Sequence, residues 1–219
     1  MQNLKDKHQK NKKRKWLFAL VVIIFLVTVG LILLLTQSTR ISAELGQAKA
    51  QYSIGLNYYQ KKNYVKARTW LVKASNQKNA DAENTLAVMY LNGLGVRKDA
   101  LKAEGLFQDS AKKGNKYAQE HLGTLYYFGQ GVVKDYTIAE KWLKKSSDAG
   151  MENSQNLLGT MFLYGQGVEK NKQMAIELYR KSAAQGNKYA QANLKNWGYQ
   201  PNNFDFSIYL RLDTNDRLK

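Results

Sequence analysis

Hydrophobic and polar positions follow two different patterns along the chain. Residues 16–36 read WLFALVVIIFLVTVGLILLLT, an apolar stretch without a single charge. Beyond residue 47, small and apolar residues instead return at every third or fourth position, which is the spacing of one face of an amphipathic helix. The patterns predict one long apolar helix followed by a series of short amphipathic helices, so the expected fold class is all-α.

The second pattern repeats every 36 residues, a period typical of stacked helical repeats. Three sets of positions recur at this interval: Ala82, Ala118, Ser154 and Ala190; Leu86, Leu122, Leu158 and Leu194; and Tyr90, Tyr126 and Phe162. A Gly-x-Gly-Val loop also recurs in phase, starting at Gly93, Gly129 and Gly165. Each unit is therefore predicted to be two helices joined by a glycine-containing turn. No unit buries its apolar face alone, so the units are expected to stack.

Residues suited to helix ends recur with the same period. The first helix of the first full unit is expected from about Ala82 to Leu91. The second helices are expected to begin after N-cap residues and to end before glycines that suit the left-handed C′ position. These residues are Asp99, Asp135 and Asn171 at the start, and Gly114, Gly150 and Gly186 at the end.

The units divide the chain into segments. A tetratricopeptide-like first hairpin is expected at 47–79, with a loop shorter by four residues, and three full repeats at 80–187. A capping helix is expected at 188–201. The C-terminal segment 202–219 alternates apolar and polar residues like a strand, and two roles stay open for it: packing on the last hairpin or contacting a partner.

The apolar stretch is interpreted as a single transmembrane helix, because 21 helical residues span about 30 Å, the thickness of the hydrocarbon core. A cleaved signal peptide and a buried soluble helix are the alternatives. Residues 1–15 hold seven Lys or Arg, which predicts a cytoplasmic tail by the positive-inside rule. Residues 37–46 are then a linker, and the repeats lie on the periplasmic or extracellular side of the inner (plasma) membrane.

The repeated pattern A/S-x3-L-G/A-x2-Y/F-x2-G-x-G-V…D/N-x3-A-x2-W/L-x3-S-x3-G resembles the Sel-one-like repeat family (SLR), a relative of tetratricopeptide repeats. The match runs through 82–114, 118–150 and 154–186, and loosely through 50–77. The resemblance implies a right-handed superhelical solenoid of α-hairpins that acts as a scaffold or adaptor for protein partners. Some bacterial members look like immunity proteins that block secreted antibacterial phospholipases.

Catalytic and cofactor chemistry find no support in the sequence. The chain has no cysteine and two histidines, His8 in the basic tail and His121 in a first helix, where a surface or contact role is expected. A zinc or nucleophilic site needs several convergent groups. The Gly-x-Gly loops lack the strand and third glycine of a dinucleotide site, and so are interpreted as turns. Neither an enzyme nor a metal or cofactor site is expected.

First helices of such stacks line the concave surface, so partner contacts are sought there. Apolar and aromatic positions outside the packing pattern predict an exposed stripe, and the alternative is that these side chains pack against the next repeat. The candidate partner-binding residues are Tyr52, Leu56, Tyr59, Val88, Leu91, Thr124, Tyr127, Phe128, Thr160, Leu163 and Tyr164.

Positive charge gathers in the first hairpin, in a chain whose formal net charge is +17. Three interpretations stay open for this patch: contact with anionic lipid or envelope polymer, attraction of an acidic partner, and a solvated face. Nucleic acid is not expected, because the domain is predicted to be exported. Between residues 46 and 80 there is no acid, and the basic residues are Lys49, Lys61, Lys62, Lys66, Arg68, Lys73 and Lys78.

These observations leave three functional hypotheses. The first is a membrane-anchored adaptor of the cell envelope. The second is an immunity protein that neutralises a secreted antibacterial effector. The third is a module that binds envelope polymers or anionic lipid.

Overall fold

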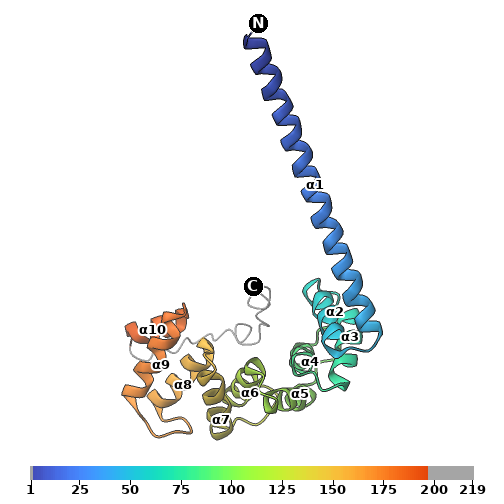
Figure 1. Cartoon of the computed structure of the whole chain (residues 1–219). Helices are drawn as coiled ribbons and strands as arrows, with labels where there is room; N and C mark the ends of the chain where they lie inside the picture. The colour runs from blue at the N-terminus through green and yellow to red at the C-terminus, as the bar shows by residue number, and fades with distance from the viewer. Residues whose placement is uncertain (1, 197–219) are drawn as a thin grey trace.

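The structure is a computed structural model, and it describes residues 2–196. Every regular element in that range is an α-helix, which confirms the all-α prediction. Within residues 2–196, α2 to α9 form a curved row of four antiparallel pairs, α10 follows the last pair, and α1 projects from the end of the row that α2 and α3 form (Figure 1). The elements are α1 (Gln2–Glu44), α2 (Ala48–Gln60), α3 (Tyr64–Asn76), α4 (Ala80–Asn92), α5 (Ala100–Lys112), α6 (Lys116–Phe128), α7 (Tyr136–Asp148), α8 (Glu152–Tyr164), α9 (Lys172–Ala184) and α10 (Lys188–Asn196).

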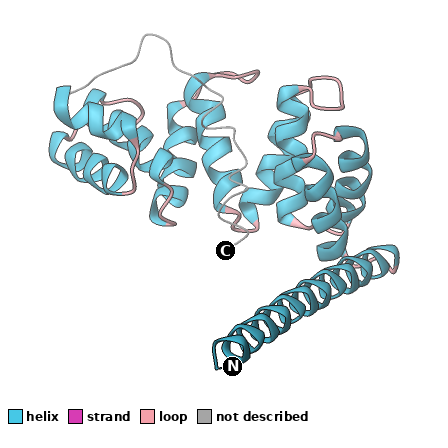
Figure 2. Ribbon diagram, turned by 90° about the horizontal axis from the view of Figure 1, so that it is seen from above, coloured by secondary structure: helices cyan, strands magenta, loops and turns pink. Residues whose placement is uncertain are grey.

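Consecutive helices pair as α2/α3, α4/α5, α6/α7 and α8/α9, with α10 closing the row. The first helices α4, α6 and α8 lie on the inner side of the curve, and the second helices α5, α7 and α9 lie on the outer side (Figure 1). Figure 2, seen from above, shows the same row of hairpins and the long loops that join their helices. The solenoid predicted from the 36-residue period is therefore the observed architecture.

Helix α1 has an apolar surface that no other element covers. Its candidate membrane span runs over 16–44, and the most apolar 18-residue window of this span is not buried inside the fold, so it is not a core helix. The helix continues through 37–44, where a linker was expected, and its last turn packs on α2. There Ala43 is 1% exposed and its carbonyl accepts a hydrogen bond from Gln51 Nε2 at 3.1 Å. The end of α1 thus occupies the place of a second helix before the first hairpin.

The predicted helix ends are confirmed by the caps of the second helices. The side chains of Asp99, Asp135 and Asn171 each accept a hydrogen bond from the backbone N–H three residues later, at 2.9, 2.9 and 3.0 Å. These bonds satisfy a donor that would otherwise lack a partner at the helix start. The first hairpin has a three-residue loop where the others have seven, as its sequence predicts.

Two glycine positions set the close approach of helices. Within the third hairpin, a Cβ built on Gly123 would lie 2.6 Å from Leu143 Cγ, so α6 and α7 touch there. Between hairpins, a Cβ on Gly131 would lie 2.2 Å from Ala100 Cβ, and Gly131 also has a φ of +75°. The second glycine of each loop therefore rests on the first turn of the preceding second helix. The loops are structural turns, as predicted. Each loop joins the two helices of its own hairpin and packs on the hairpin before it.

Apolar contacts run across the joints between hairpins. One cluster joins Tyr52 and Leu71 of the first hairpin to Leu86 and Met89 of the second. Leu71, Leu86 and Met89 are at most 2% exposed. Burial at a joint needs both neighbours, which is why stacked repeats stabilise one another.

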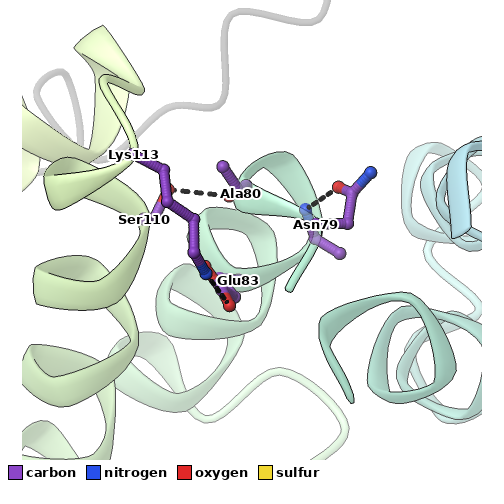
Figure 3. Close-up of polar contacts among 6 residues, drawn as sticks. Asn79, Ala80, Glu83, Ser110 and Lys113 are labelled. Atoms are coloured by element: carbon purple, nitrogen blue, oxygen red, sulfur yellow. Dashed lines mark hydrogen bonds and ion pairs between the residues drawn. The ribbon is translucent and has the colours of Figure 1, made fainter. Parts of the chain in front are cut away.

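Polar contacts close the end of the second hairpin away from its loop (Figure 3). Ser110 Oγ of α5 donates to the carbonyl of Ala80 at 2.7 Å, and Lys113 forms an ion pair with the buried carboxylate of Glu83. Asn79 caps α4 by accepting from the N–H of Ala82 at 2.9 Å. The serine contact returns 72 residues later, where Ser182 donates to the carbonyl of Glu152.

The predicted capping helix is described as far as residue 196, as α10. The rest of that segment, 197–201, and the C-terminal segment 202–219 lie outside the described residues.

Candidate partner-binding surfaces

An open groove lies along the inner side of the first two joints. It has a volume of about 770 Å³ and is lined by one face of α2 and by the first turns of α4 and α6. Tyr52, Leu56 and Tyr117 give it an apolar floor, and Lys49 and Asp81 add charge. We call this surface, formed by Lys49, Tyr52, Leu56, Asp81, Lys116, Tyr117 and their neighbours, the inner groove.

The structure divides the predicted stripe into interior and accessible residues. Five of its members are buried: Tyr52, Val88, Leu91, Thr124 and Tyr127 are 8%, 1%, 4%, 1% and 7% exposed. The expectation of a continuous exposed stripe does not hold for these five, and all but Thr124 lie in apolar clusters that join neighbouring hairpins. Their side chains pack the joints, which was the alternative interpretation.

Tyr127 shows what such a position does. Its ring packs edge-on against Phe128 and Tyr136, and its hydroxyl donates to Gln166 Oε1 in the next loop at 2.8 Å. Burial raises the pKa of this hydroxyl above its ordinary value, and the neighbouring Tyr136 adds to the effect. Tyr127 therefore links the third hairpin to the fourth.

The other stripe residues retain some accessibility. Although Tyr52 is buried, it lines the inner groove together with the half-buried Leu56. Farther along, Tyr164 is 42% exposed. The half-buried members of the stripe are Leu56, Tyr59, Phe128, Thr160 and Leu163. These accessible positions remain the candidates for contact with a partner.

All seven basic residues predicted in the first hairpin are exposed. They do not form one patch around a single site. Lys49 lines the inner groove, while Lys66 and Lys73 lie over the rings of Tyr58 and Trp70, at 5.6 and 4.6 Å from the ring centroids.

Arg68 borders a second hollow of about 470 Å³ at the loop end of the joint between the first two hairpins. We call this site the cationic hollow. Its walls carry Arg68 of α3, Tyr90 of α4, Arg97 and Lys98 of the connecting loop, and Lys102 of α5. Arg97, Lys98 and Lys102 were not predicted as part of a site, because residues 97–102 approach Arg68 only once the hairpins stack. Comparing equivalent positions of the repeats would identify these cations, because the next two repeats carry fewer basic residues at the same places.

A buried histidine lies in the third hairpin. His121 is 1% exposed, so it does not lie on the surface, and its ring packs on Phe107 with the centroids 5.1 Å apart. Within residues 2–196, no three His, Cys, Asp or Glu side chains are placed to hold a metal ion.

Beside it, Glu120 is 4% exposed and accepts hydrogen bonds from Asn153 and Ser154 of α8, at 3.3 and 3.1 Å. Burial, with a smaller contribution from the negative charge of Glu152, raises the pKa of the Glu120 carboxyl to about 7, and the bonds from Asn153 and Ser154 oppose this rise.

Comparisons with known proteins agree with this architecture. The Sel1 repeat model matches four consecutive segments, 44–79, 80–115, 116–151 and 153–187, and so includes the short first hairpin. No match to a curated protein was found. Proteins with Sel1 repeats generally mediate protein–protein interactions.

Two solved structures are similar over 73% of the chain. One is a protective antigen of uropathogenic Escherichia coli with an SLR fold, at 36% identity and a TM-score of 0.68. The other is a Sel1 repeat protein from Oxalobacter formigenes, at 28% identity and a TM-score of 0.67. The chain spans 35% of the length of the first structure and 66% of the second. With four matched repeats and the shared fold, the chain belongs to the Sel1 repeat family.

Proposed function

We propose that the chain is a single-pass membrane-anchored adaptor of the cell envelope, which binds a protein partner along the inner side of its repeat stack. The inner groove carries this proposal, because it is an open surface of about 770 Å³ that combines apolar side chains with separated charges. Aromatic and aliphatic anchors surrounded by polar groups are typical of protein interfaces.

Two features support the anchor. Residues 16–44 form a helix long and apolar enough to cross a membrane, and the apolar side chains there are exposed. Seven Lys or Arg precede this span within 1–15, which favours a cytoplasmic N-terminus. The repeats then lie on the periplasmic or extracellular side of the inner membrane. In Figure 1, α1 leaves the row on the side toward which the curve opens, so the inner side of the row faces the membrane-proximal space.

Crosslinking in membranes followed by affinity capture of the intact chain tests the adaptor function. The double variant Leu56→Ala/Tyr117→Ala removes the apolar floor of the inner groove and should reduce capture of a specific partner at least fivefold. The control variant Leu101→Ala/Val133→Ala removes two apolar side chains that are 71% and 87% exposed elsewhere, and should capture normally.

Equal capture by both double variants, with helicity retained, would exclude the inner groove as the interface. A captured partner that is a secreted phospholipase would favour the immunity role over a general adaptor. Binding of purified envelope polymer or anionic vesicles without any captured protein would favour the third hypothesis.

A further inference from the structure

We propose that the cationic hollow binds the carboxylates of an acidic segment in a protein partner. This inference rests on the proposed adaptor function and deepens it by naming the chemistry of the partner. Four cations from three elements surround the hollow, and its one acid, Asp99, uses its side chain to cap α5 by accepting from the N–H of Lys102 at 2.9 Å.

The same place in the fold occurs at the next two joints, but only the first is cationic. Summed over the four cationic positions of the hollow and the residue that caps the second helix, the formal charge is +3 at the first joint and −1 at each of the other two. The charge is therefore not a requirement of the stacking. In the order Arg68, Arg97, Lys98 and Lys102, the equivalents are Glu104, Val133, Lys134 and Ile138 at the second joint, and Glu140, Glu169, Lys170 and Met174 at the third.

The second joint shows how a carboxylate is held at this place. There the hydroxyl of Tyr126 donates a hydrogen bond to the carboxylate of Glu104. In the cationic hollow Tyr90 is the equivalent of Tyr126, and Arg68 stands where Glu104 would be. Among residues 2–196, the Tyr90 hydroxyl has no hydrogen-bond partner. A carboxylate from another chain supplies the acceptor that the second joint provides internally.

The cations of the hollow are available for such a ligand. Arg68, Arg97, Lys98 and Lys102 are exposed, and the ion pairs of the described residues involve none of them. Lys102 is placed by the ring of Tyr90, with Nζ 4.4 Å from the ring centroid. The guanidinium of an arginine matches a carboxylate in a bidentate manner. The N-terminus of α5 adds its positive dipole.

Binding of a labelled hexaglutamate peptide to the full chain, held in phosphatidylcholine nanodiscs, tests this proposal by fluorescence anisotropy. The Arg68→Glu variant recreates the pairing of the second joint, so it should fold normally and lose affinity at least tenfold. The control Arg180→Glu makes the same charge change on the exposed face of α9 and should lose less than threefold. Tyr90→Phe should lose affinity about threefold, since one hydrogen bond is removed.

Equal losses in Arg68→Glu and Arg180→Glu would overturn the proposal, because the peptide would then sense only net charge. Displacement of the peptide by inorganic phosphate at a lower concentration than by unlabelled hexaglutamate would overturn it in favour of a phosphate site.

Partner capture separates this proposal from the adaptor function. If Arg68→Glu captures a partner from membranes as well as the wild type does, the cationic hollow is not the binding site of that partner, and the adaptor function still stands. Peptide binding as expected, with no partner captured by any variant, would refute the adaptor function and leave the carboxylate preference of the hollow standing.

Discussion

Replacing Glu120 with Gln should stabilise the joint between the third and fourth hairpins, and only at neutral and alkaline pH. Glu120 of α6 is buried against α8, and among the described residues it has no ion pair. The equivalent positions in the second and fourth hairpins are the neutral amides Asn84 and Asn156. A glutamine at 120 keeps an oxygen that accepts from Ser154, and it removes the buried charge.

The magnitude follows from the shifted pKa. Burial, followed by the charge of Glu152 on α8, raises the pKa of Glu120 from 4.5 to about 7 in the folded chain. The folded state therefore holds a proton that the unfolded state releases between these values. The resulting stability is fully present below pH 4.5 and is lost as the pH rises through 7. At pH 8 the ionised carboxylate costs up to about 3 kcal/mol.

Hydrogen exchange followed by mass spectrometry, with peptides from α6 and α8, measures this effect in the full chain. Comparing the variant with the wild type at the same pH removes the intrinsic pH dependence of exchange. Glu120→Gln should protect both helices more strongly at pH 8 and leave protection at pH 5 nearly unchanged. Glu169→Gln, which removes an exposed loop carboxylate, should change neither.

Guanidinium unfolding at both pH values provides the corresponding free energies. Two results would refute the reasoning. One is a variant that is less stable than the wild type at pH 8. The other is a gain of equal size at pH 5 and pH 8, which would show that packing, and not the buried charge, limits the joint.

The remaining predictions concern the joints and the anchor. Gly131→Ala should lower the free energy of unfolding by about 2 to 4 kcal/mol, because it forces a Cβ against Ala100 at a positive φ. Gly105→Ala, on an open helix face, should raise it by about 0.5 to 1 kcal/mol; thermal denaturation compares the two. Lys78→Gly should stabilise by about 0.5 to 1 kcal/mol in the same assay, because Lys78 has a φ of +60° where later units have glycine. Single cysteines in the cysteine-free chain report topology: in intact cells an impermeant maleimide should label Asp109→Cys and not Asn3→Cys, and the opposite pattern would invert the proposed orientation.

Local chemistry explains why the helix ends were predictable from the sequence. A cap such as Asp99 acts on a backbone group three residues away, so the interaction is encoded within one turn. The short loop of the first hairpin and the glycine joints are local in the same sense. The 36-residue repeat then predicted that the hairpins stack, since each unit lacks a complete core of its own.

Surface residues were less predictable, because exposure depends on how neighbouring hairpins cross. Val88 and Thr124 have the spacing of an exposed face on their own helices, but both are buried in the stacked chain. The cationic hollow was missed for the related reason that Arg68 and Lys102 meet only across a joint. Aligning the repeats shows Arg68 where the next two units have glutamate, and that difference was readable without a structure.

The continuity of α1 into its contact with α2 has a consequence for reach and direction. If residues 16–36 cross the bilayer as proposed, the helical residues 37–44, a rise of about 12 Å, and the short turn 45–47 separate the hydrocarbon core from α2. One residue inserted there would lift the row by about 1.5 Å and turn it by about 100° around the helix axis. Seven inserted residues would nearly restore the original orientation of the row and place it about 10 Å farther from the membrane. The length of α1 beyond residue 36 therefore sets both the distance of the repeat row from the membrane and the direction in which its inner side faces.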